Sequence, residues 1–443
     1  MKIYFQKSTF LVLFLFLLTN LSFAQSINFP EPRQDKLLNG LKVLVWNQPK
    51  TSRITVKIRV HSGSAFDPQD KMGTMVLLGR ILFPEDGIKQ FFEEDLEGNL
   101  EIINTYDYMQ INATAKADEF VSLLETLAPA ISNPSIDKEK TAKVKAEHLE
   151  KLKELEKNPG YVADRAIAER LLGDFPYGRP IQGTTESVEN IDFADLIFAE
   201  QRFFNADNTT IAIIGDVNPD FAYKAARRLF GAWKKGDNKV PATFRLPDEP
   251  DEAPLIVNVD EENVIENRYA VNAFARNNKD YSATEILTEI LNERFKKASE
   301  KKGLKSVKVE NISNLLRGYI VFTEKYNSAN QAVTESDAKS NAFITKLFTE
   351  KISAEEFNRA KNKVSSKLSK MDAADFYLDL DSYKLDTPKK ELKKIESVML
   401  SDVEKVAIKL SKEKVADVLI SSIEKEETTV NPIKNKDPND PRK

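Results

Sequence analysis

The stretch Ile54-Thr-Val-Lys-Ile-Arg-Val-His61 alternates apolar and polar side chains. A period of two predicts a β-strand that turns its apolar residues toward a core and its polar residues away from it. The surrounding sequence adds elements that we predict as helices over 73–83, 118–130, 137–157 and 161–172 and as strands over 109–115 and 209–215. This mixed order indicates an α+β fold with a largely antiparallel sheet.

The same plan recurs after a linker. Residues 234–254 carry four prolines among Asp, Glu and Lys and little apolar periodicity, which is typical of a linker. Beyond it, we predict strands over 255–259 and 268–275, near Val307, over 319–322 and over 416–421, and helices from Ser282, Gln331 and Ser353. Duplication of one plan predicts two homologous lobes arranged as a clamshell, each with an antiparallel-rich mixed sheet and helices packed on one face. The predicted lobes are 25–233 and 255–423, followed by a disordered tail over 424–443.

Residues 1–24 have the features of an export signal. Lys2 and Lys7 precede the apolar run 10–18, and Ser22-Phe-Ala24 places small residues at a cleavage position. The apolar run is too short to span a bilayer, and no cysteine follows it to carry a lipid. We expect a signal peptide and an exported protein, periplasmic or secreted, without a membrane anchor.

Composition narrows the chemistry available to the chain. Its 443 residues include 65 Lys and Arg against 69 Asp and Glu, with two His and no Cys. A formal charge of −4 gives no electrostatic reason to bind nucleic acid. Export would permit disulfides, but without cysteine the core alone must stabilise the fold.

Four short strings together resemble the insulinase/pitrilysin peptidase family. They are Leu38-Asn-Gly-Leu-Lys-Val-Leu44, Gly63-Ser-Ala-Phe-Asp-Pro-Gln-Asp-Lys-Met-Gly-Thr74, Phe175-Pro-Tyr-Gly-Arg-Pro-Ile-Gln-Gly-Thr184 and Ile214-Gly-Asp-Val-Asn-Pro219. Each string alone is a weak signal, but their combination across residues 37–422 is similar to the short two-lobed members related to mitochondrial processing peptidase subunits.

The resemblance implies a zinc motif that this sequence lacks. Active members carry His-x-x-Glu-His on the helix after the glycine-threonine step, where two histidines hold zinc and the glutamate deprotonates the bound water. Val76, Gly79 and Arg80 stand at these three positions. Valine and glycine offer no donor atom and arginine stays protonated, so we expect no bound zinc and no catalytic residue here. Gly79 within a helix indicates either close packing by a neighbouring backbone or free drift at a former active-site position.

Glu147 matches the family's third zinc ligand, in the string Lys140-Thr-Ala-Lys-Val-Lys-Ala-Glu147. Two interpretations follow. The favoured one is a solvated carboxylate on a highly charged helix. The other is an ion pair with Arg80, in which a cation takes the place of zinc.

The two histidines offer no substitute site. His61 shares the polar face of its strand with Lys57 and Arg59, and His148 points about 100° away from Glu147 around its helix. We therefore predict that both are ordinary surface histidines. A serine triad would need one of them as its base, and no Gly-x-Ser-x-Gly string is present.

In the second lobe, related proteins hold substrate backbone with an arginine and a tyrosine. Arg294 matches the arginine, and Ser306 occupies the tyrosine position. Arg294 is either a helix-surface cation or a weak candidate for a substrate contact. The segment 99–108 is also shorter than the family's substrate-pairing edge strand, which argues against peptide binding by strand addition.

Three hypotheses for function remain. The first is a non-catalytic subunit that pairs with a zinc-bearing homologue in a heterodimeric periplasmic peptidase. The second is a stand-alone peptide-binding or scaffold protein on the same fold. The third, and least favoured, is an active metallopeptidase with unconventional ligands, because no group able to activate water is evident.

Overall fold

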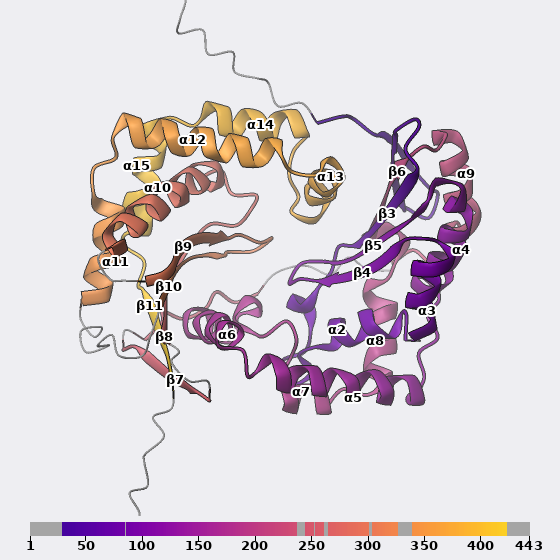
Figure 1. Ribbon diagram of the computed structural model, residues 1–443, viewed down its shortest axis with the longest axis horizontal. Helices are drawn as coiled ribbons and strands as arrows, with labels where there is room; N and C mark the ends of the chain where they lie inside the picture. The colour runs from indigo at the N-terminus through magenta and orange to yellow at the C-terminus, as the bar shows by residue number, and fades with distance from the viewer. Residues whose placement is uncertain are drawn as a thin grey trace, which may run out of the picture.

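The computed structural model describes residues 29–84, 86–236, 244–251, 253–260, 265–300, 304–326 and 339–422. Figure 1 shows two lobes side by side, each built on one β-sheet. The predicted α+β clamshell of two lobes is confirmed. The predicted signal peptide, the tail and the start of the helix predicted from Gln331 lie outside the described residues.

The N-terminal lobe contains a six-stranded sheet in the order β1-β2-β6-β3-β5-β4. Its strands are β1 (Arg33–Lys36), β2 (Lys42–Asn47), β3 (Arg53–Val60), β4 (Asn99–Asn104), β5 (Met109–Lys116) and β6 (Thr209–Gly215). The helices are α2 (Thr74–Ile81), α3 (Asp86–Gln90), α4 (Phe120–Ser132), α5 (Lys138–Leu155), α6 (Pro159–Leu172), α7 (Thr185–Glu189), α8 (Phe193–Phe203) and α9 (Pro219–Phe230).

The C-terminal lobe contains a five-stranded sheet in the order β7-β11-β8-β10-β9. Its strands are β7 (Leu255–Val259), β8 (Ile265–Asn272), β9 (Leu304–Ile312), β10 (Tyr319–Tyr326) and β11 (Ala416–Ser422). The helices are α10 (Tyr281–Ser299), α11 (Lys339–Thr349), α12 (Ala354–Ser369), α13 (Ala373–Ser382), α14 (Pro388–Ser397) and α15 (Leu400–Leu410).

The two sheets share one topology. In the first, the last strand β6 lies between β2 and β3, parallel to β2 and antiparallel to β3. In the second, the last strand β11 lies between β7 and β8 with the same two directions. The remaining pairs, β3 with β5 and β5 with β4, match β8 with β10 and β10 with β9, and all four are antiparallel.

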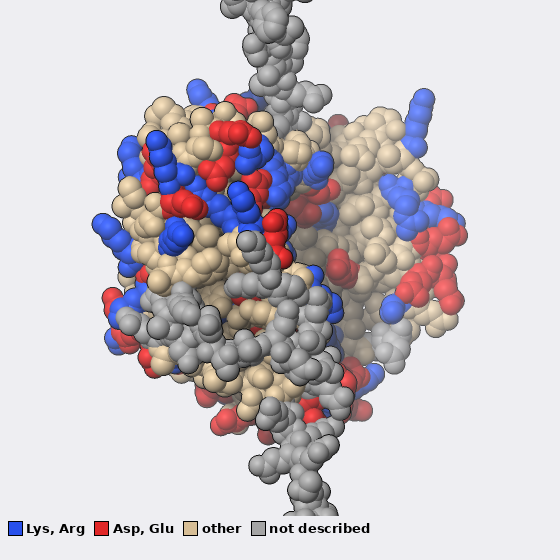
Figure 2. Space-filling view, turned by 60° about the vertical axis from the view of Figure 1, so that its left-hand side comes forward, with Lys and Arg blue, Asp and Glu red and all other residues tan. Residues whose placement is uncertain are grey.

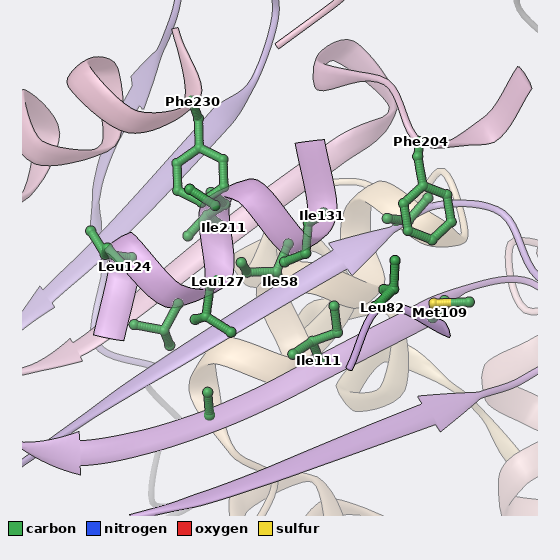
Figure 3. Packing of buried hydrophobic residues seen from close by; sticks show 14 of the residues in the cluster. Ile58, Leu82, Met109, Ile111, Leu124, Leu127, Ile131, Phe204, Ile211 and Phe230 are labelled. Atoms are coloured by element: carbon green, nitrogen blue, oxygen red, sulfur yellow. The ribbon is translucent and has the colours of Figure 1, made fainter. Parts of the chain in front are cut away.

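The core of the N-terminal lobe follows the alternation seen in the sequence. Ile54, Val56, Ile58 and Val60, at every second position of β3, are fully buried. Figure 3 shows Ile58, Ile111 and Ile211 of the sheet packed near Leu124, Leu127 and Ile131 of α4 and Phe230 of α9. Burial of this apolar face supplies the main driving force for folding of the lobe.

Each lobe covers the second face of the other lobe's sheet with a helix. Helix α6 packs on β8 and β11 of the C-terminal lobe through a cluster that includes Ile167 and Val418. Helix α13 packs on the N-terminal sheet, where Phe376 joins a cluster with Leu44 and Trp46. Neither exchange was predicted from the sequence, because the residues involved are far apart in the chain.

Charged side chains hold α13 on the polar face of β3. Arg59 has a side chain only 2% exposed, and its Nη1 lies 2.6 Å from Asp379 Oδ1. The same guanidinium stacks 3.9 Å from the ring centroid of Tyr108, and its Nε donates to Gln110 at 2.6 Å. Lys57 donates to Asp375 at 2.7 Å. The face of β3 that the alternation turns away from the core is therefore buried against the other lobe.

Replacing Arg59 tests this junction. Arg59→Leu leaves Asp379 buried without its cation, and loss of one partner of a buried pair typically costs about 3–5 kcal/mol. We expect the free energy of unfolding, measured by urea denaturation, to fall by about that amount. Arg245→Leu is the matched control, since Arg245 and its partner Asp248 are 85% and 88% exposed. Its expected loss is at most about 1 kcal/mol, and equal losses in the two variants would contradict a buried junction.

Candidate functional site

The helix that would carry the zinc motif is α2. Gly73 precedes it with φ of 96°, in the left-handed region that glycine adopts without strain. The buried Asp67 accepts hydrogen bonds from the backbone nitrogens of Gly73 at 2.9 Å and Met75 at 3.1 Å. These contacts fix the first turn of α2, so the positions of the former motif are well defined.

Val76 and Gly79 are buried in packing with neighbouring elements. Val76 is 4% exposed. A Cβ on Gly79 would lie 3.2 Å from the side-chain nitrogen of Asn104 and 3.2 Å from Cε of Met109. The three nearest atoms belong to side chains of β4 and β5 and not to a neighbouring backbone, and they would have to shift by a few tenths of an ångström to admit a Cβ.

The less favoured interpretation of Glu147, an ion pair with Arg80, is not seen within the described residues. Within the described residues, no nitrogen of Arg80 comes within 4.0 Å of a carboxylate oxygen. Partial burial lowers the pKa of Arg80, and the charge of Glu147 opposes this shift from a distance. Glu147 is 51% exposed and lies 4.0 Å from Lys143 on the same helix. The interpretation of Glu147 as a solvated carboxylate fits this geometry.

His148, predicted to be at the surface, is fully buried. Its Nε2 lies 2.7 Å from the carbonyl oxygen of Gln182. The buried positions of α5 are Thr141, Val144, His148 and Leu152, at spacings of three and four. The apolar residues Val144 and Leu152 are spaced so that they share one helical face with His148 and not with Glu147. This spacing in the sequence could have predicted that His148 is buried.

His148 makes stability dependent on pH. Burial lowers its pKa from 6.5 to about 4. The unfolded chain therefore binds the proton more tightly, and stability falls as the pH drops from about 6.5 toward 4. We expect wild-type protein to lose about 2 kcal/mol between pH 7.5 and 5 through this group alone. His148→Gln should lose correspondingly less when chemical denaturation is compared at the two pH values, and an unchanged pH dependence would contradict the assignment.

His61, also predicted to be at the surface, lies half-buried at the junction of the lobes. Its Nδ1 is 2.9 Å from Ser382 Oγ of α13, and its Nε2 is 2.9 Å from Thr210 Oγ1 of β6. Burial lowers its pKa to about 3, so the ring is neutral near pH 7. The polar face of its strand was correctly assigned. Its exposure was wrong because α13 covers that face.

Arg294 is neither a surface cation nor free for a substrate. It is 8% exposed, and its Nε lies 3.0 Å from Glu356 Oε1. Its remaining donors reach the carbonyl oxygens of Leu347, Glu350 and Lys351 at 2.9 to 3.0 Å. Burial opposes ionisation of Glu356, but the hydrogen bonds of Arg294 lower the pKa of that carboxyl to about 2. Arg294 thus joins α11 to α12, while Ser306 lies exposed on β9.

The residues around α2 do not fit a zinc ion. The described part of the chain contains no group of three or more His, Cys, Asp or Glu side chains placed to hold a metal. Zinc sites in proteins use three or four such ligands.

Among the described residues, no helix is long and apolar enough to cross a membrane.

Comparison with known proteins defines the family. Residues 42–185 match the insulinase model (peptidase family M16), and residues 190–364 match the model described as the peptidase M16 inactive domain. The chain belongs to the insulinase family, peptidase family M16. Its two-lobed fold and the order of its elements are consistent with the short members of this family.

Curated relatives of this family member are distant. An uncharacterized zinc protease of Rickettsia felis is 24% identical over 216 residues, which cover 47% of this chain and 52% of the relative. The mitochondrial-processing peptidase subunit beta of Saccharomyces cerevisiae is 24% identical over 221 residues, which cover 49% of this chain and 48% of the relative. The chain therefore spans about half the length of the curated relatives it matches.

Solved structures match over nearly the whole chain. A protease from Helicobacter pylori has a TM-score of 0.78 at 16% identity, covering 89% of this chain and 100% of that structure. A peptidase M16 inactive domain from Pseudomonas fluorescens has a TM-score of 0.76 at 19% identity, covering 88% and 98%. At these identities the likeness establishes the fold alone.

Proposed function

We propose that this insulinase-family chain is a non-catalytic, exported subunit that pairs with a zinc-bearing homologue in a periplasmic peptidase. The observation that carries the proposal is the packing of α2. Val76 is buried, at 4% exposure, and a Cβ on Gly79 would lie 3.2 Å from the side chain of Asn104, tighter than an ordinary contact. A chain that keeps two complete lobes while its motif positions serve as packing is suited to a structural role beside an active partner.

The relatives support a subunit role. One of them is named as subunit beta of the mitochondrial-processing peptidase, and another as a zinc protease. The structural match named as an inactive domain indicates that the fold also occurs without activity assigned to it. In the proposed complex the partner supplies the zinc ligands and the base, and this chain supplies the facing wall of the chamber.

Co-purification tests the proposal. The tagged chain is recovered from the native envelope fraction, and zinc and cleavage of an unstructured peptide are measured in the recovered material. We expect an equimolar homologue with an intact His-x-x-Glu-His motif, with zinc equimolar to that homologue. The chain purified alone should contain no zinc and cleave nothing. Recovery as a monomer, or zinc that stays with the isolated chain, would contradict the proposal.

Glu147→Gln in this chain provides a matched control for the location of the metal. Glu147 occupies the third-ligand position but is half exposed, and among the described residues its cation partner within 4.0 Å is Lys143. We expect zinc content and cleavage of the complex to stay at the wild-type level. The equivalent Glu→Gln change in the partner should abolish both zinc retention and cleavage. Loss of zinc from the Glu147→Gln complex would show that this chain holds the metal.

A second candidate is a scaffold or binding protein without a peptidase partner. The hydrogen bonds of Arg294 favour this candidate. Its guanidinium nitrogens donate to Glu356 and to backbone carbonyl oxygens of this chain, so these donors are not available to hold a peptide. The same co-purification separates the two candidates. A scaffold is recovered with proteins that lack a zinc motif, and the recovered material does not cleave peptides.

A further inference from the structure

A cleft of about 920 Å³ lies between the two lobes, away from the positions of the zinc motif. Its walls come from β1, β2 and the segment 202–210 of the N-terminal lobe and from the end of α13 in the C-terminal lobe. The volume is in the range of small-molecule sites, which are clefts of about 300–1,000 Å³. None of its lining residues belongs to the motif discussed above.

The floor of the cleft is a chain of hydrogen bonds that crosses between the lobes. His61 contacts Ser382 and Thr210, each at 2.9 Å, and Thr210 donates to Asp381 at 3.0 Å. Lys42 in turn donates to Asp381 at 3.0 Å. The floor is thus a fixed array of polar groups in which the single carboxylate is already neutralised by a lysine.

Uncompensated positive charge surrounds this floor. Four cations and two carboxylates line the cleft, in a protein whose formal charge is −4. Lys36, Arg202 and Lys384 are exposed, and no carboxylate of the described residues lies within 4.0 Å of their charged nitrogens. On the face shown in Figure 2, by contrast, Lys and Arg are mixed with Asp and Glu. The lining also includes Asp207, but its net charge is positive, and a net positive cleft concentrates anionic ligands.

Lys384, one of the cations of the cleft, has an unusual backbone conformation. It follows the last residues of α13 with φ of 56°, in the left-handed region. Glycine is the usual residue at this position after a helix, because a side chain there costs about 1 kcal/mol. A lysine is found instead, and it places its ammonium group at the edge of the cleft, where it contacts the carbonyl oxygen of Asp381 at 3.2 Å.

Apolar side chains complete the walls. They are Phe66, Phe203, Leu315, Leu316, Leu380 and Leu385. A ligand that satisfies both parts of the lining has a compact anionic head for the cations and an apolar body for these residues.

We propose that this cleft binds a small ligand with an oxyanion head, a carboxylate or a phosphate, on an apolar body. The head lies among Lys36, Arg202 and Lys384, above the hydrogen-bonded floor. The body lies against the leucine and phenylalanine side chains. Because both lobes line the cleft, a bound ligand adds contacts across the junction and stabilises the folded state. The proposal does not depend on the presence of a peptidase partner.

Calorimetric titration of the full chain tests the cleft with three probes. N-acetyl-dileucine carries a carboxylate on an apolar body, its C-terminal amide lacks the charge, and hexyl phosphate carries the alternative head. We expect one or both anions to bind and the amide to bind at least about tenfold more weakly, with affinity for the anions falling as salt is added. A preference for one of the two anions shows whether the head group of the ligand is a carboxylate or a phosphate. Absence of binding by both anions at millimolar concentration, or equal binding of the amide, would overturn the proposal.

A charge-matched pair of variants locates the binding. Lys36→Gln/Arg202→Gln/Lys384→Gln removes the three exposed cations of the cleft and leaves Lys42 with Asp381, whereas Lys296→Gln/Lys297→Gln/Lys412→Gln removes three exposed cations elsewhere. The first should weaken anion binding at least about tenfold and the second should leave it unchanged. Thermal unfolding and the single Lys36→Gln variant check that the fold is retained. Equal loss in both triple variants would mean that binding follows net charge and would refute a site in the cleft.

Discussion

The contact between β3 and α13 determines how the rest of the molecule is arranged. Lys57 and Arg59 project from one face of the strand toward carboxylates on the helix, and Asp375 and Asp379 are four residues apart on it. Buried charges are tolerated only when they are paired, so the helix can dock in only one register. That register joins the two lobes, covers the second face of the N-terminal sheet and forms the floor of the cleft between them.

The reciprocal helix exchange joins the two duplicated lobes. Helix α6 leaves its own lobe to cover the C-terminal sheet, as α13 covers the N-terminal sheet. Each sheet therefore depends on the other half of the chain to bury its second face. A large apolar and ionic interface of this kind opposes independent motion of the lobes.

Loss of the zinc motif and retention of the fold have different physical requirements. Zinc needs donor atoms at a few positions, and neither Val76 nor Arg80 supplies one. The fold needs burial spread over the whole core, and each lobe has a large cluster of buried apolar side chains. A family member can therefore lose its chemistry while its lobes, its junction and any site built on that junction persist. This separation makes a non-catalytic subunit a consistent reading of the molecule.

Much of the architecture could be predicted from local sequence. Alternation in β3 gave its core-facing side, helical spacing gave α4, α5 and α6, and string matching located Val76, Gly79 and Arg80 as positions without ligands. These features depend on neighbours a few residues away. The helical spacing of α5 also indicated that His148 is buried, but the surroundings of His61 and of Arg294 could not be predicted in the same way. The partner of His61, Ser382, lies 321 residues along the chain, and only the tertiary structure brings the two together, because burial of a polar face depends on which distant element covers it.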